Sequence, residues 1–312
     1  MVKKVSGKNG LVELFRFICS IWVAYFHGFF PILSDNFDGV NISIDFFFMV
    51  SGLFFLKSME KLKEKHFFEG AKFIFWNKIK GFVVPLIIAA LSILTCNIIF
   101  EWDLNHFNWP LSFLWFFLAQ FVYLSLFYLL LKNVKRLARF NILCLAIICI
   151  TVSSCLLDNE TIGRIVRGPG MISLGILLSQ IPKIKIKSIT EIKSKRRTLT
   201  INLVGFILAA TAFAYLAYLP EYQVWKLHLF LFVVCTALLY FATSIPVRSN
   251  LLNFLGEFSI FIYLAQCPIL IHYYAGTQES KDQFGWLCFY AVVLFVINRI
   301  ANKFIMRKKV AI

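Results

Sequence analysis

Ten apolar runs, each close to the length needed to cross a bilayer, constrain this chain more than any other feature. A helix that spans the roughly 30 Å hydrocarbon core needs about 20 mainly apolar residues. We expect spans at 11–30, 40–56, 81–99, 111–131, 140–157, 165–181, 199–219, 225–244, 254–274 and 284–304. The second run is short, and the sixth is broken by Gly168, Pro169, Gly170 and Gly175. The pattern predicts an all-α polytopic membrane protein with one domain over residues 1–312.

Composition points to the same class. The chain is 60% apolar and 15% charged, whereas soluble domains carry roughly 25% charged residues. The net charge of +16 would first suggest nucleic-acid binding, but the basic residues lie in short segments between the apolar runs. No nucleic-acid partner is therefore expected. The eight cysteines form no CxxC motif or Cys/His cluster, so neither a disulfide framework nor a metal site is predicted.

The distribution of charge gives the orientation. With the N-terminus inside, the segments 1–10, 57–80, 132–139, 182–198, 245–252 and 305–312 are internal and hold 25 of the 32 Lys and Arg residues. We assign four basic residues to the outer loops: Arg164, Arg167, Lys226 and Lys281. The positive-inside rule then predicts cytoplasmic N- and C-termini, in the inner (cytoplasmic) membrane. Because Arg16 interrupts the first run, we expect an uncleaved span there and no signal peptide.

Three ionisable residues fall inside the first two runs, where charge is costly and functional by default. Arg16 and His27 are eleven residues apart, which places them on one helix face about 16 Å apart along the axis. An apolar stretch separates them, so a long thin ligand could lie along this face. Asp45 is expected near the outer end of the second span, at a depth similar to that of His27. A carboxylate beside an imidazole fixes its tautomer and raises its basicity, as a general base requires.

Each of these residues also has a structural interpretation. His27 could be an interhelical hydrogen-bonding group, and Arg16 could extend to the inner interface. Lys78 and Lys80 flank the inner end of the third span, where they suit phosphate groups but also fit an ordinary basic loop. Trp115 is interpreted as an interfacial anchor and Gln120 as a packing hydrogen bond. Glu257 and Arg299, near inner ends, are interpreted as structural.

Five segments in order resemble acyltransferase family 3, the membrane-bound O-acyltransferases. Arg16-x10-His27 has the family's Arg/Lys-x10-His spacing, and 44–52, from Ile44 to Ser51-Gly52, is similar to its Asp-x-Phe-Phe-x-x-Ser-Gly signature. Residues 76–85 resemble its basic approach to the third span, and 114–118 its Leu-Trp-Phe-Leu element. Residues 255–264 are similar to its Leu-Gly-x-x-Ser…Tyr-Leu segment. The chain departs from the family at Gln266, where His is frequent, and at Lys78, where Arg is usual.

The resemblance implies ten core helices and transfer of an acyl group, usually acetyl from acetyl-CoA, to a hydroxyl of an envelope saccharide or glycolipid. Acetyl-CoA would be a co-substrate, with no bound cofactor. On this hypothesis, His27 is the base, Asp45 orients it, and Arg16, Lys78 and Lys80 bind the donor. Ser51, Trp115 and Gln120 would be acceptor-side or structural residues. The extracytoplasmic hydrolase-like domain of longer members is not expected.

Two other functions stay open at this point. A transporter or flippase of a lipid-linked glycan would use intramembrane Arg, His and Asp as substrate or proton sites. The chain has no evident duplicated halves, which are frequent in transporters. A non-catalytic membrane scaffold would tolerate apolar replacements of all three charged residues. The sequence does not specify the acceptor glycan or the length of the acyl chain. It also does not distinguish direct transfer from a route through an acyl-enzyme.

Overall fold

A computed structural model gives the fold of the chain. It describes residues 9–24, 39–60, 62, 66–79, 87, 90–91, 109–132, 134–135, 138–145, 147–148, 160–181, 196–217, 228–274 and 280–310. Over these ranges the secondary structure is helical, with no β-strand. The all-α prediction is therefore confirmed for the described residues.

The helices follow one another with short connections where these are described. Their bounds are α1 Gly10–Ala24, α2 Gly39–Glu60, α3 Phe67–Ile79, α5 Trp109–Lys132, α7 Glu160–Gln180, α9 Arg196–Ala217, α11 His228–Ser244, α12 Asn250–Tyr274 and α13 Ser280–Val310. Residues 138–145 are also helical. The expected runs at 111–131, 199–219 and 225–244 correspond to α5, α9 and α11 within a few residues. The run at 81–99 and much of that at 140–157 lie outside the described residues.

Several helices are longer than expected, and one was not expected. The α2 helix continues four residues past the predicted end at residue 56, and α13 extends the predicted 284–304 run at both ends. The predicted inner segment 57–80 contains α3, whose first turn carries Glu69. That segment is too short and too charged to read as a span, so a search for apolar runs passes over it.

The sixth run is a continuous helix, α7, despite Pro169 in its interior. Proline removes one backbone donor and usually breaks a helix in water. In an apolar surrounding, however, leaving the helix would expose many more unpaired backbone groups. The Ser173 hydroxyl donates a hydrogen bond to the Pro169 carbonyl at 2.9 Å. The glycines on either side of Pro169 do not end the helix. Gly168 and Gly175 instead let neighbouring residues of α2 and α5 pack closely on α7.

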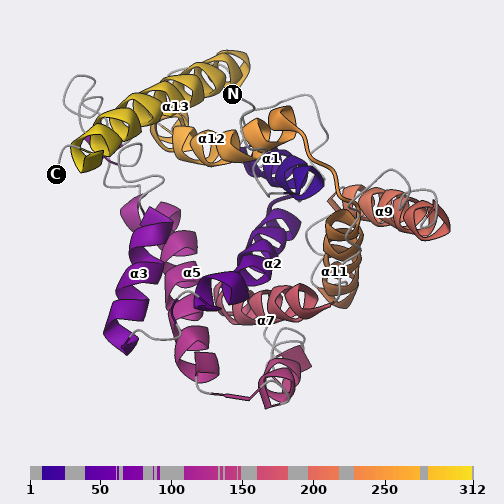
Figure 1. The fold of residues 1–312 in the computed structure, drawn as a ribbon. Coiled ribbons are helices and arrows are strands. Elements are labelled where there is room, and N and C mark those ends of the chain that lie inside the picture. The colour runs from indigo at the N-terminus through magenta and orange to yellow at the C-terminus, as the bar shows by residue number, and fades with distance from the viewer. Residues whose placement is uncertain are drawn as a thin grey trace.

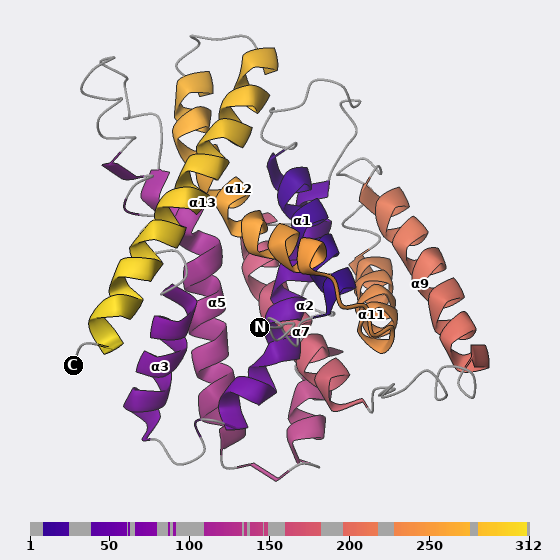
Figure 2. The same ribbon diagram turned by 45° about the horizontal axis from the view of Figure 1, so that its top comes forward.

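The α2 helix lies at the centre of the bundle, and the other helices gather around it (Figures 1 and 2). It contacts α1, α5, α7, α9 and α11, while α12 packs on α1 and α13, α3 on α5, and α9 on α11. An aromatic cluster fills the junction of α1, α2 and α9. Phe15, Phe46 and Phe213 lie with ring centroids 5.7 to 6.1 Å apart, and Trp22 stacks on Phe213 at 5.3 Å.

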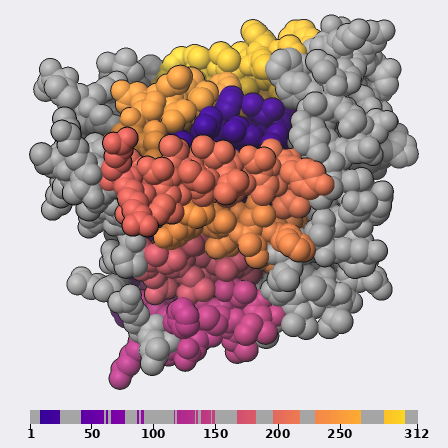
Figure 3. Space-filling view, turned by 90° about the vertical axis from the view of Figure 1, so that its right-hand side faces the viewer, coloured from indigo at the N-terminus to yellow at the C-terminus, as the bar shows by residue number. Residues whose placement is uncertain are grey.

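The α9 helix covers one side of the molecule (Figure 3). Its outward side chains are apolar, including Ile201, Ile207 and Leu208, each more than half exposed. In water such a surface would be unstable without a partner. Among the described residues, Ile42–Met59 and Arg196–Ala217 are long and apolar enough to cross a membrane by length and composition. Shorter apolar stretches occur at Ala119–Lys132, Phe230–Ser244 and Gly285–Ala301.

Candidate functional site: ion pairs on α1 and between α2 and α7

The start of α1 is fixed to the segment that leads into α12. Asn9 caps α1 with its side-chain oxygen, which accepts a hydrogen bond from the amide of Leu11 at 3.0 Å. The Asn9 amide group donates to the carbonyl of Ile245 at 2.8 Å, and the Gly10 amide donates to the carbonyl of Val247 at 2.9 Å. These bonds set where α1 begins relative to α12.

The first ion pair joins Arg16 to Glu13, one turn earlier on α1. The Nη1–Oε2 distance is 2.8 Å, and the side chains are 28% and 2% exposed respectively. Glu13 lies against α12 at Gly256, where a Cβ atom would overlap the Glu13 carboxylate. A buried carboxylate must be paired to be tolerated. Gly256 therefore makes room for Glu13, and Glu13 holds the guanidinium of Arg16.

The same contacts give the register of α1 against α12. Gly10 packs on Leu252 and Glu13 on Gly256, so residue numbers rise together and the two helices are parallel. One side of α12, marked by Gly256 and containing Ser259, Tyr263 and Gln266, therefore runs along α1 from Glu13 outward. These four positions, which we call the α12 strip, are spaced by three, four and three residues and fall within an arc of about 80°.

The second ion pair joins Asp45 of α2 to Arg167 of α7. The Nε–Oδ1 distance is 2.7 Å, and the side chains are 1% and 4% exposed for Asp45 and Arg167 respectively. Arg167 falls in the predicted span 165–181 although it was counted with the outer loops, and the structure places it inside α7. A carboxylate has about four lone-pair sites, so the ion pair does not exhaust the hydrogen-bonding capacity of Asp45.

Close packing of α2 on α7 supports this pair. A Cβ atom at Gly52 would overlap the carbonyl oxygen of Ile172, and one at Gly175 would overlap that of Met49. Small residues that let backbones touch are the main device of helix association in membranes. Asp45 pairs with Arg167, Phe48 lies against Gly168 and Gly52 against Ile172, so residue numbers rise together and α2 and α7 are parallel. The backbones therefore fix the height of Asp45 relative to Arg167.

The α1–α2 register places Asp45 low on α1. Cys19 and Ser43 are joined by a side-chain hydrogen bond, and Phe15 packs on Phe46. The helices are thus antiparallel, with Asp45 level with residues 16 and 17. His27 lies outside the described residues. On a regular helix continued from Ala24, it would lie about 15 Å beyond the level of Asp45 along the axis. The predicted His27–Asp45 contact stays a prediction, and it requires the chain to leave that geometry after Ala24.

The other predicted site residues have the following places. Lys78 lies in α3 and Trp115 in α5, but their side chains are outside the described part of the structure, as is Lys80. Gln120 is buried in α5. The Ser51 hydroxyl donates to the Phe47 carbonyl at 3.0 Å within α2, a bond that also suits a structural role.

Two of these outcomes concern residues that sequence reasoning undervalued. Glu13 was overlooked, although its spacing of three from Arg16 is a signal for an ion pair on a helix. Arg167 falls within the predicted span 165–181, and a charge at such a position is by itself a signal for a functional or paired residue. Glu257 and Arg299, interpreted as structural, do pair at 2.8 Å on the exposed side of α12 and α13.

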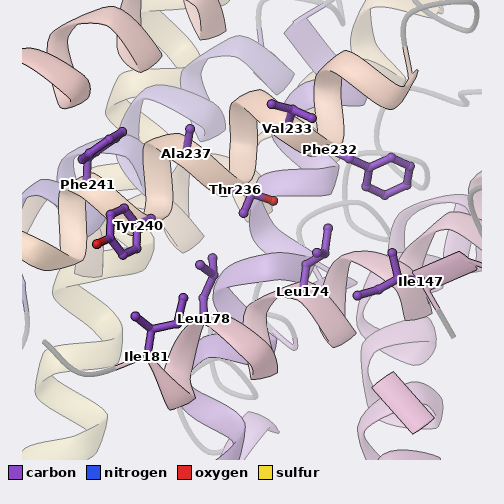
Figure 4. A pocket seen from close by; sticks show the side chains of 10 residues that line it. All are labelled: Ile147, Leu174, Leu178, Ile181, Phe232, Val233, Thr236, Ala237, Tyr240 and Phe241. Carbon is purple, nitrogen blue, oxygen red and sulfur yellow. The ribbon is translucent and has the colours of Figure 1, made fainter. Parts of the chain in front are cut away.

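A groove between α7 and α11 contributes no chemistry to this site. It has a volume of about 520 Å³, and Figure 4 shows Leu174 and Leu178 of α7 facing Thr236 and Tyr240 of α11 across it. Apart from those two hydroxyl groups its lining is apolar. Among the described residues no group of three His, Cys, Asp or Glu side chains could hold a metal ion.

Over the described residues, helices with apolar outward faces pack around an ion pair buried between α2 and α7, an arrangement that suits a membrane. The family model described as an acyltransferase domain matches residues 9–298, so the chain belongs to acyltransferase family 3. Members of this family are typically membrane-bound, and the protein is a membrane acyltransferase in that general sense. Neither the curated proteins nor the solved structures contain a match to it.

Proposed function

We propose that the protein is an O-acetyltransferase of the cytoplasmic membrane. It would move the acetyl group of cytoplasmic acetyl-CoA to a hydroxyl of an envelope saccharide or glycolipid on the outer side. The observation that carries this proposal is the acyltransferase family match over residues 9–298. The partly exposed guanidinium of Arg16, held by Glu13 near the start of α1, has N–H groups left to donate to a ligand on that side.

The proposal needs ten spans with both termini in the cytoplasm. Helix directions support this arrangement. Alternation along ten spans requires α1 and α2 to be antiparallel, and it requires α1 with α12, and α2 with α7, to be parallel. Two contacts for each helix pair give these directions: Phe15–Phe46 and Cys19–Ser43, Gly10–Leu252 and Glu13–Gly256, and Asp45–Arg167 and Gly52–Ile172.

In the proposed reaction, His27 takes the proton of the acceptor hydroxyl. The hydroxyl oxygen attacks the thioester carbonyl carbon and forms a C–O bond, and the carbonyl electron pair moves onto oxygen. When the carbonyl re-forms, the C–S bond breaks, and the CoA thiolate leaves with the proton from His27. An acyl-enzyme route through His27 uses the same residue, and trapping of radiolabelled acetyl-protein separates the two.

The remaining residues have supporting roles in this proposal. Arg16, Lys78 and Lys80 bind the donor's phosphates and pantetheine arm. Asp45 is proposed to orient the imidazole of His27, and its ion pair with Arg167 keeps the carboxylate charged in the bundle. Arg16 retains donors for the ligand because guanidinium has five N–H groups, of which the pair with Glu13 uses Nη1.

The test uses purified protein in lipid nanodiscs, [¹⁴C]acetyl-CoA, and surface glycan from a deletion strain that lacks the protein. We expect wild-type protein to transfer label to the glycan and His27→Ala to lose transfer at unchanged protein level. His66→Ala is the matched control, because His66 is exposed at the start of α3, and it should retain wild-type activity. Wild-type rates in His27→Ala would refute the mechanism. Glycan translocation without label transfer would favour the transporter.

A further inference from the structure

Gln266 is a buried residue whose side-chain NH₂ group lacks a hydrogen-bond partner in the part of the chain that the structure describes. Its side chain lies on α12 and is 1% exposed. Its Nε2 group has no hydrogen-bond partner among the described residues. Buried donors are nearly always paired, so each exception requires an explanation. A donor kept unpaired at a buried position in an enzyme is explained if a ligand supplies the acceptor.

The α12 strip places this donor further along α1 than Arg16. Gln266 is ten residues beyond Gly256, which packs on Glu13. In the parallel register it is level with residue 23 of α1, about 10 Å further along than Arg16. Gln266 therefore lies on the outer side of the proposed phosphate-binding end, where the acyl end of a donor bound at Arg16 would extend.

Other polar groups of the α12 strip are already engaged. The Ser259 hydroxyl donates to the carbonyl of Gly256 at 2.8 Å. Tyr263 packs against Phe116 of α5 with centroids 6.4 Å apart. Gln266 is thus the member of the strip whose donor has no partner among the described residues.

We propose that Gln266 donates its Nε2–H to the carbonyl oxygen of the donor's acyl thioester. This inference rests on the proposed function. When the acceptor oxygen bonds to the carbonyl carbon, the electron pair moves onto that oxygen, and the hydrogen bond from Gln266 shortens and strengthens. Collapse of the intermediate expels CoA thiolate, and the bond weakens again. A neutral amide suits this position because it stabilises the oxyanion without adding another full charge inside the bundle.

The test compares Gln266→Met, which keeps the volume and removes the donor, with Asn298→Leu as a matched control. Asn298 is a buried amide of α13, 9% exposed, whose Oδ1 likewise has no partner among the described residues. Loss of one oxyanion donor lowers kcat by about 100- to 1000-fold. We expect that fall in Gln266→Met, with KM for acetyl-CoA within about threefold of wild type. The control should keep wild-type kcat.

Stability separates this role from a structural one. An unpaired buried N–H donor does not stabilise the fold, so Gln266→Met should melt at the wild-type temperature or above it. Gln266→Asn, which retracts the amide by one methylene, should lie between Gln266→Met and wild type in kcat. Wild-type kcat in Gln266→Met, or a lowered melting temperature together with the lost activity, would overturn the inference alone. If wild-type protein transfers no acetyl group, the proposed function falls and the inference falls with it.

Discussion

The Asp45–Arg167 pair permits a quantitative test of how α2 and α7 are held together. Asp45→Leu and Arg167→Met each remove one partner and leave the other charge buried, which costs about 3 to 5 kcal/mol. Replacing both partners by apolar side chains leaves no buried charge, and such replacements are often neutral or stabilising. Because both side chains are under 5% exposed and their atoms are 2.7 Å apart, little solvent screening reduces these effects.

The assay is the apparent melting temperature of purified protein in one detergent, followed by tryptophan fluorescence. Each single variant should melt roughly 10 °C lower than wild type, and the double variant should lie close to wild type. Arg299→Met is the matched control, because the Arg299–Glu257 pair is exposed at 58% and 43%, and exposed pairs contribute about 0 to 1 kcal/mol. Additive losses in the double variant, or single variants that melt like wild type, would refute the reasoning.

Three further predictions follow from close contacts and exposed faces. Glu13→Gln removes the charge that holds Arg16, so KM for acetyl-CoA should rise several-fold in the transfer assay; an unchanged KM would separate Arg16 from donor binding. Gly52→Ala places a methyl group on the Ile172 carbonyl, and detergent-purified protein should be destabilised by about 1 to 3 kcal/mol, whereas a wild-type melting temperature would argue against the α2–α7 contact. Ile207→Lys puts a charge at the centre of the exposed face of α9, which costs about 2.5 to 3.5 kcal/mol if that face meets lipid; unimpaired membrane insertion in a glycosylation-reporter assay would contradict lipid contact there.

The sequence predicts the helices that coincide with long apolar runs. It predicts less well the helices whose formation depends on the surrounding structure. The α5 and α9 helices follow long uninterrupted runs, so their bounds came within a few residues. The α7 helix contains Pro169, and its continuity depends on a solvent that cannot satisfy a broken backbone. The α3 helix is short and partly charged, and no hydropathy window marks it. These differences arise from context that no local pattern contains.

Partner choice across the bundle was the harder part of the site. The sequence identifies Asp45 as an intramembrane carboxylate and predicts His27 as its partner, whereas the structure pairs it with Arg167. The choice depends on register, because Asp45 lies level with residues 16 and 17 of α1 and faces Arg167 across a glycine-lined contact. A helical wheel gives the face of a residue but not its height against a neighbouring helix.

The Glu13–Arg16 pair changes what kind of donor site the start of α1 can form. Glu13 cancels the charge of Arg16 locally, so this end of α1 has almost no net attraction for an anion. Arg16 can then orient a bound donor through hydrogen bonds from its remaining N–H groups, but it contributes little long-range attraction. Attraction for the phosphates of acetyl-CoA would come from other basic side chains of the inner segments, among which Lys78 and Lys80 are proposed. Salt should therefore weaken acetyl-CoA binding in wild type and in Arg16→Gln with the same slope, whereas Lys78→Gln should reduce that slope. An equal reduction of the slope by Arg16→Gln would show that Glu13 does not neutralise Arg16.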